Sequence, residues 1–106
     1  MRSSHSHIAE VVSALQDQSQ RDRFVNAVKI LKEHLIHKRE IPNGKDFLFA
    51  GTAGSLHEAL RDLRDLEQQA SRFLQFDFAK IEGYFLLRII GGSDHQTVID
   101  SYFDQA

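Results

Sequence analysis

The amino-terminal part of the chain has apolar residues at helical spacing. Between Ser6 and Gln18, four apolar side chains repeat on one helix face: Ile8, Val11, Val12 and Leu15. After a polar break at 17–20, apolar residues recur at i, i+4, i+7 and i+11 between Arg21 and Arg39: Phe24, Val28, Leu31 and Leu35. We therefore expect two helices that pack as an antiparallel pair.

The next segment changes from helical to strand-like spacing. Ile41-Pro42-Asn43-Gly44 is expected to end the second helix, because proline disfavours helix at the preceding residue and Asn-Gly readily forms a tight turn. From Asp46 to Ala50, Phe47 and Phe49 alternate with other residues. This alternation predicts a short strand.

A third helix is predicted from Ser55 to about Ser71. The loop 51–54 leads into Ser55, which has the spacing of a capping box with Glu58. Five residues then share one face of the helix: Leu56, Leu60, Leu63, Leu66 and Ala70. We expect Leu60 and Leu63 to lie in the core.

Residues 73–90 are rich in aromatic and β-branched side chains, and they predict a β-hairpin that turns at Glu82-Gly83. A pairing of Ile81 with Tyr84 fixes the rest of the register. It places Asp77 opposite Arg88 and sets two apolar pairs, Phe78 with Leu87 and Phe76 with Ile89. A slip by one residue would lose all three matches.

A final helix is predicted from Ser93 to about Gln105, after the break at Gly91-Gly92. Its expected buried residues are Val98, Ile99, Tyr102 and Phe103. The elements together predict one α+β domain over residues 1–106, of order ααβαββα, with an antiparallel hairpin packed against helices. Residues 1–6 are expected to form a mobile tail.

Composition narrows the class of protein. The 106 residues are 42% apolar and 26% charged, which is typical of a globular domain. The absence of cysteine excludes disulfides and fits a reducing compartment, and no apolar run is long enough for a leader or a membrane span, so we expect a cytoplasmic protein.

The formal net charge of −2 argues against a nucleic-acid partner. The basic residues of the second predicted helix scatter around its axis and form no continuous patch: Lys29, Lys32, Lys38 and Arg39.

The two faces of the predicted hairpin differ in chemistry. One is uniformly apolar and must pack on helices, whereas the other mixes Tyr84, Leu86 and further apolar residues with the pair Asp77 and Arg88. Such a mixed face suits a protein contact, because a monomer would expose a large apolar patch. The alternative is that helices also cover this face and that Asp77 and Arg88 form an ordinary cross-strand pair.

Other candidates carry weaker signals. The glycine loops at 51–55 and 91–93 could hold an anion at a helix start, but neither has a P-loop lysine, so we interpret them as turns. His34 and His37 lie at i, i+3 with no third ligand in the sequence, so no metal site is predicted. His57 and His95 fall in first helical turns without a paired nucleophile, and no catalytic residue is predicted.

The sequence thus favours a non-enzymatic interaction or accessory module, a homodimer or the binder of another protein, with no cofactor. Its expected binding residues are Asp77, Tyr84, Leu86 and Arg88. The alternative is a protein that binds a small molecule or anion, an enzyme included, in a pocket around Asp77, Arg88 and Tyr84.

Overall fold

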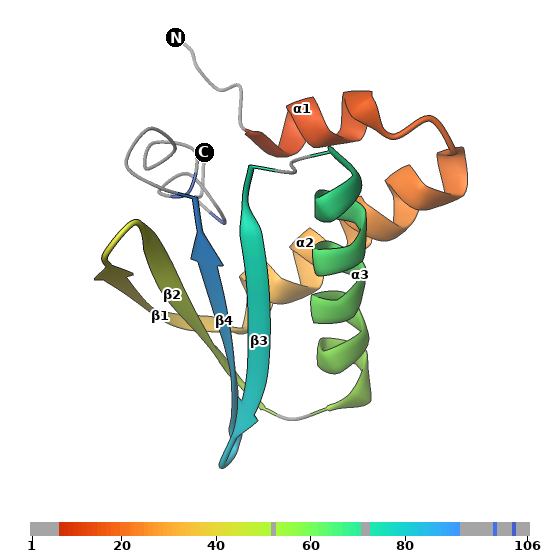
Figure 1. The fold of residues 1–106 in the computed structure, drawn as a ribbon. Helices are drawn as coiled ribbons and strands as arrows, with labels where there is room; N and C mark the ends of the chain where they lie inside the picture. The colour runs from red at the N-terminus through yellow and green to blue at the C-terminus, as the bar shows by residue number, and fades with distance from the viewer. Residues whose placement is uncertain (1–6, 52, 71–72, 92–98, 100–102, 104–106) are drawn as a thin grey trace, which may run out of the picture.

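The computed structural model describes residues 7–51, 53–70, 73–91, 99 and 103. Its elements are α1 (His7–Ala14), α2 (Gln18–His34), β1 (Leu35–Ile41), β2 (Gly44–Ala50), α3 (Gly54–Ala70), β3 (Gln75–Ile81) and β4 (Tyr84–Ile90) (Figure 1). The four strands form one antiparallel sheet in the order β1-β2-β4-β3. The predicted α+β fold is confirmed.

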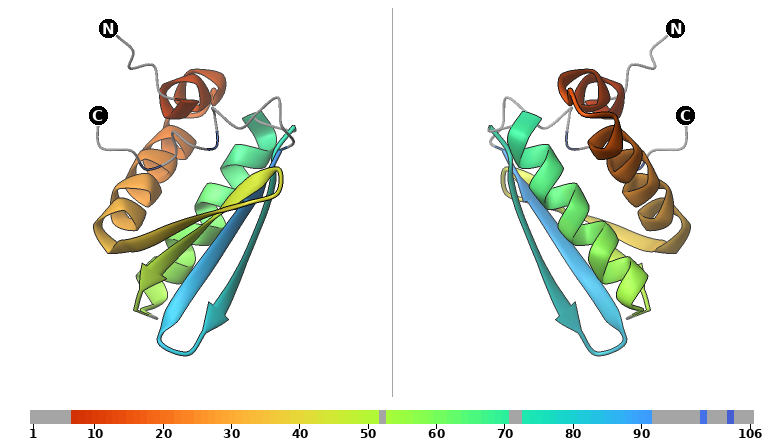
Figure 2. Two further views of the ribbon diagram at one scale, coloured as in Figure 1. Left: turned by 90° about the vertical axis from the view of Figure 1, so that its left-hand side faces the viewer. Right: turned by 90° about the vertical axis from the view of Figure 1, so that its right-hand side faces the viewer.

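The molecule has two layers. Helices α2 and α3 lie together against one face of the sheet, and no described helix covers the opposite face (Figure 2). Alternate residues of the strands point into the layer between sheet and helices, where they meet the apolar face of α3. Leu60 and Leu63 are fully buried there, as the sequence predicts. The buried apolar residues of the strands are Phe47, Phe49, Phe76, Phe85, Leu87 and Ile89.

The predicted hairpin is confirmed in turn and register. Ile81 pairs with Tyr84, and Asp77 lies directly across from Arg88. Gly83 has a φ of 76°, a conformation that glycine adopts without steric cost. The turn is held in place from outside the hairpin, since the Gly51 N–H donates to the Gly83 carbonyl at 3.0 Å.

The second predicted helix is wrong from Leu35 to Arg39. It ends at His34, and Leu35–Ile41 is the strand β1, paired along β2. The two-residue turn is Pro42-Asn43, with Asn43 at a φ of 62°, and not Asn43-Gly44. Gly44 already belongs to β2, where a β-carbon would collide with the carbonyl oxygen of Ile89. Cross-strand hydrogen bonds to β2 outweigh the weak helical preference of this charged segment.

The helix boundaries and partners also differ in detail from the prediction. The N-cap of α2 is Asp17, whose carboxylate accepts from the Ser19 N–H at 2.9 Å, and this hydrogen bond lowers the pKa of Asp17. Helix α3 begins at Gly54, so Ser55 lies inside its first turn and not at the cap. Helix α2 packs mainly along α3 rather than on α1.

The predicted final helix lies largely outside the described residues, as does the predicted tail at 1–6. Two of its expected buried residues are described, and both Ile99 and Phe103 are buried. The Phe103 ring meets Phe47 and Phe49 edge-on, with centroid distances of 5.2 and 5.6 Å. Ile99 and Phe103 therefore contribute to the core, and Phe103 packs beside β2.

Candidate functional site

The mixed face of the hairpin is the outward face of the sheet, because its residues alternate along each strand with the buried residues that face the helices. The outward face is the one away from α2 and α3 (Figure 2). Ile81 and Tyr84 are 45% and 42% exposed, and Leu86 and Ile90 are half-buried. Within the described residues, the alternative in which helices cover both faces is therefore wrong. The strand registers assign these residues to the outward face: His37, Arg39, Ile41, Asp46, Leu48, Ala50, Gln75, Asp77, Ala79, Ile81, Tyr84, Leu86, Arg88 and Ile90.

A row of four charged residues crosses the whole outward face. Arg39 pairs with Asp46, Asp46 with Arg88, and Arg88 with Asp77. In the spatial order of the strands, the charges of this row alternate from positive to negative. We call Arg39, Asp46, Arg88 and Asp77 the charge row.

Asp46 is the centre of the charge row. Its side chain is 3% exposed because two guanidinium groups cover it. Arg88 donates from Nε to Oδ1 at 2.8 Å and from Nη2 to Oδ2 at 2.9 Å, and Arg39 donates from Nη2 to Oδ2 at 2.9 Å. A carboxylate with two arginine partners is a strong, geometrically fixed acceptor.

The ion pair expected between Asp77 and Arg88 does not form. The two residues are cross-strand neighbours, but the Arg88 side chain turns to Asp46 on the other adjacent strand. Asp77 is exposed and accepts a hydrogen bond from Gln75 Nε2 at 3.1 Å. Arg88 selects Asp46 because that carboxylate can accept both of its N–H groups and is shielded from water.

The ion pairs shift the pKa values in the direction of full ionisation. The hydrogen bond from Arg88 holds the pKa of Asp46 below its usual value, burial opposes this shift, and the hydrogen bond from Arg39 adds to it. The pKa of Arg88 is raised, chiefly by its hydrogen bond to Asp46. The central pair of the row is therefore charged at neutral pH.

Apolar side chains flank the charge row. Leu48 pairs with Leu86 on one side of it, and Ala50 pairs with Tyr84 further along. A hollow of 220 Å³ lies in this face, lined by Asp77, Phe78, Ala79, Leu86 and Arg88. Three of the four predicted binding residues thus line one hollow, and Tyr84 does not.

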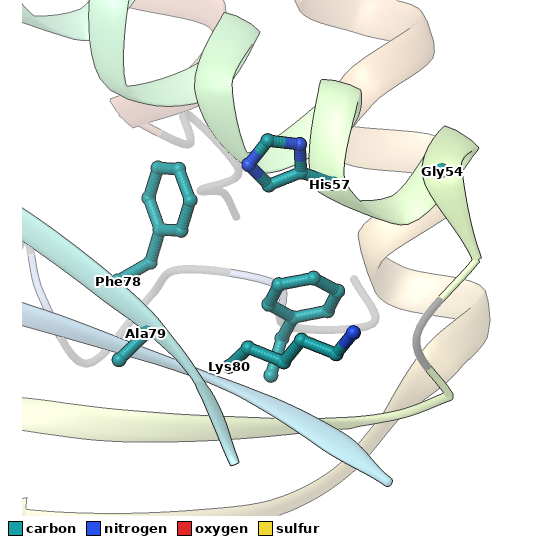
Figure 3. A pocket seen from close by; sticks show the side chains of 6 residues that line it. Gly54, His57, Phe78, Ala79 and Lys80 are labelled. Carbon is teal, nitrogen blue, oxygen red and sulfur yellow. The ribbon is translucent and has the colours of Figure 1, made fainter. Parts of the chain in front are cut away.

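A larger cavity of 490 Å³ lies on the helix side of β3, between this strand and α3 (Figure 3). We call it the edge groove; its lining is Gly54, His57, Phe78, Ala79, Lys80 and Phe85. The His57 ring stacks on Phe85 at 5.8 Å and meets Phe78 edge-on at 5.7 Å. His57 therefore lies between aromatic rings, and no catalytic partner is next to it among the described residues.

The remaining candidates are not assembled into a site. His34 ends α2, with Nδ1 at 2.9 Å from the Ile30 carbonyl oxygen, whereas His37 belongs to β1, so they do not share a helix face. The described residues hold no cluster of metal-ligand side chains and no helix long and apolar enough to cross a membrane. His95 lies outside the described residues.

Sequence reasoning missed Arg39 and Asp46. The sequence predicts a helix at Arg39, and at Asp46 a strand whose neighbour it does not show. One signal was available, since an Asn-Gly dipeptide directly before a strand is a hairpin signal and implies a strand on its other side.

No family model, curated protein or solved structure matches this chain. A function for this chain is therefore proposed from the geometry of its described residues.

Proposed function

We propose that the protein is a small, non-enzymatic interaction module that forms a homodimer through the outward face of its sheet. The observation that carries this proposal is the alternating charge row on a face that no described helix covers. A chain without cysteine fits a reducing compartment, which supports the cytoplasm as its location.

The charge row is complementary to a second copy of itself. Consider two such faces stacked about a two-fold axis that runs parallel to the strands, between β2 and β4. Strand β1 would then lie over the partner's β3, and Arg39 over the partner's Asp77. Asp46 would lie over the partner's Arg88. A two-fold axis along the row would instead bring each charge over its own copy, so electrostatics selects the first arrangement.

The apolar residues suit the same arrangement. Leu48 would meet the partner's Leu86, because these residues are neighbours on β2 and β4 in the same row. The small Ala50 would lie opposite the partner's Tyr84, which gives the large ring room between the sheets. Two sheets stacked in this way pack about 10 Å apart with their strands nearly aligned, as in β-sandwiches.

The size of the face predicts a reversible dimer. Four strands of seven residues span a flat area of about 450 Å², from the usual strand spacing and rise. A typical stable interface buries roughly 800 Å² on each partner. Because small interfaces are typical of weak, transient contacts, we expect a dissociation constant of about 1–100 μM.

A small-molecule site around Asp77 and Arg88 is the weaker candidate. The hollow there is 220 Å³, smaller than most ligand pockets of roughly 300 Å³ or more. Two donors of Arg88 are engaged by Asp46, which reduces what this guanidinium can offer to an anion.

Analytical ultracentrifugation over a wide concentration range tests the dimer. We expect a monomer–dimer equilibrium that Asp77→Lys weakens about tenfold, because the new lysine would face the partner's Arg39. The double variant Arg39→Glu with Asp77→Lys reverses both ends of the row and should regain most of the lost affinity.

Lys29→Glu is the matched control, since Lys29 is an exposed residue of α2 outside the outward face. It should leave the dissociation constant unchanged. A wild-type chain that stays monomeric up to about 1 mM would refute the proposal. So would a folded double variant that dimerises no better than Asp77→Lys alone.

A further inference from the structure

The two edge strands of the sheet differ in how they are protected against pairing. Strand β1 has a bulge where its register shifts between Leu35 and His37. Charged or ionisable side chains occupy residues 37–40, and Pro42 is the first residue after the strand. Bulges, charged residues and proline are the usual protection of an edge. Strand β3 has a regular register and no proline, and among the described residues no strand lies on its other side.

The geometry of the β3–β4 hairpin determines which backbone N–H and C=O groups of β3 point away from β4. A two-residue turn makes Ile81 and Tyr84 a hydrogen-bonded pair, and such pairs alternate along an antiparallel ladder. Ala79 and Asp77 therefore bond to β4. The N–H and C=O groups of Phe78 and Lys80 point to the free edge, where an added strand would find its hydrogen-bond partners.

The edge groove runs beside these free groups. It has a volume of 490 Å³, and its walls are the rings of His57, Phe78 and Phe85 (Figure 3). A side chain from an added strand on the helix side of β3 would enter this space. Aromatic walls favour an aromatic side chain there.

Basic side chains lie along the edge groove, and one of them, Arg64, is also paired with the exposed Asp65 at 3.2 Å. His57, Arg61 and Arg64 follow at i, i+4 and i+7 on α3, and so share one helix face. Arg64 confirms where this face points, because its guanidinium lies 5.0 Å from the centre of the Phe78 ring. Lys80 extends from β3 into the groove lining, and neither Lys80 nor Arg61 makes an ion pair with any described residue.

We propose that the edge groove binds an extended acidic peptide segment of another protein, which adds to β3 as a further strand. An aromatic side chain of the peptide fills the groove between His57, Phe78 and Phe85. Its acidic side chains meet Lys80 and the basic face of α3. The peptide backbone pairs with Phe78 and Lys80.

A second copy of this chain is a poor occupant of the same edge. Antiparallel pairing of two β3 strands would bring Phe76, Phe78 and Lys80 of one copy to the basic face of the other, with no acidic side chain on that side. The peptide site is also separate from the homodimer proposal, because the groove lies on the helix side of β3 and the dimer uses the outward face.

The probe is a fluorescein-labelled peptide, Thr-Asp-Thr-Phe-Thr-Glu-Thr. In an extended chain its Asp, Phe and Glu side chains share one face, which suits the alternation of the groove lining. Binding to the full chain is measured by fluorescence anisotropy. We expect saturable binding, and about tenfold weaker binding of a peptide with lysine in place of both acids.

Two protein variants separate the charge from the backbone contribution. Lys80→Thr removes the charge and keeps the N–H, whereas Lys80→Pro also removes the N–H that faces the free edge. Proline is tolerated at such edge positions, because no ladder hydrogen bond is lost. We expect Lys80→Pro to bind about tenfold more weakly than Lys80→Thr, and Arg64→Glu to bind about tenfold more weakly than wild type.

Lys29→Glu serves again as the charge control and should bind as wild type does. A probe methylated at the amide of its Phe repeats the backbone test on the unaltered protein, and it should bind weakly. No binding up to about 1 mM would overturn the proposal. Equal binding by Lys80→Pro and Lys80→Thr, with equal binding of the methylated probe, would overturn it as well. Competition by phenylacetate is the last test. If phenylacetate displaces the labelled probe at a concentration similar to that of the unlabelled peptide, the site is one for small aromatic acids and the proposal is overturned.

Discussion

Asp46 and Arg88 form the central ion pair of the outward face, with hydrogen bonds of 2.8 and 2.9 Å between residues that are 42 positions apart in the sequence. The pair links β2 to β4, the two central strands, and Arg39 extends it to β1. A buried carboxylate between two guanidinium groups therefore joins the two hairpins of the sheet.

Replacement of this carboxylate should destabilise the fold. Asp46→Asn loses the charge and one acceptor oxygen at a site with 3% exposure, so we expect a loss of about 2 kcal/mol in the free energy of unfolding. Urea unfolding at neutral pH measures it. Asp65→Asn is the control, because Asp65 is half exposed and pairs with its neighbour Arg64 on the surface.

The same pair predicts a pH dependence of stability. The pKa of Asp46 is lower in the folded state than its usual value of about 3.9, so the unfolded chain takes up the proton first as the pH falls. The contribution of Asp46 is complete above the usual value and is lost as the pH falls through the lowered pKa. The stability difference between wild type and Asp46→Asn should therefore be constant near neutral pH and shrink in acid. A difference that grows in acid would contradict the assignment.

Gly83 should be the sensitive residue of the β3–β4 turn. A β-branched side chain at a φ of 76° is strained, so Gly83→Val should cost about 1 kcal/mol or more in the free energy of unfolding. Gly83→Asn should cost less, because asparagine tolerates this conformation, as Asn43 does in the β1–β2 turn. Thermal unfolding of both variants gives the comparison.

Leu60 and Leu63 test the core between α3 and the sheet. Both are fully buried, and replacement of either by alanine should cost about 2–5 kcal/mol. Glu58→Ala, at an exposed residue of the same helix, is the control and should change the stability little. A loss below about 0.5 kcal/mol for either leucine would mean that the cavity is refilled by its neighbours.

Leu86 tests the outward face independently of the charge row. Leu86→Glu adds a charge at the centre of the proposed interface and spares the buried face of β4, so it should weaken the dimer and leave the monomer folded. Sedimentation and circular dichroism measure the two effects. A folded variant with wild-type dimerisation would remove Leu86 from the interface.

The hairpin at residues 75–90 could be predicted in full because its information is local. A glycine in the turn and complementary residues at fixed distances from it allow one register, and the structure has that register. Helix α3 was predicted for the same reason, since its apolar face repeats at helical spacing within the segment itself.

Strand β1 could not be read from its own residues. Leu35 continues the apolar spacing of α2, and the charged residues that follow are compatible with helix. Pairing with β2 decides its structure. Strand β2 is paired with β4 on one side, and its other edge is available to β1. The helix prediction is wrong at these residues because pairing with the neighbouring strand β2 outweighs their weak preference for helix.

The features of the candidate site also divide into those that the local sequence determines and those that depend on tertiary contacts. The sequence by itself determined that one hairpin face is mixed and that Asp77 lies across from Arg88, since both follow from the two-residue period of a strand. The tertiary structure decided the rest. It brought Asp46 beside Arg88. The buried carboxylate of Asp46 accepts two hydrogen bonds from Arg88 and is a better partner than the exposed carboxylate of Asp77, which stays at the end of the charge row. A side chain on a central strand has neighbours on both sides, and only the order of the strands in the sheet shows which of them is the partner.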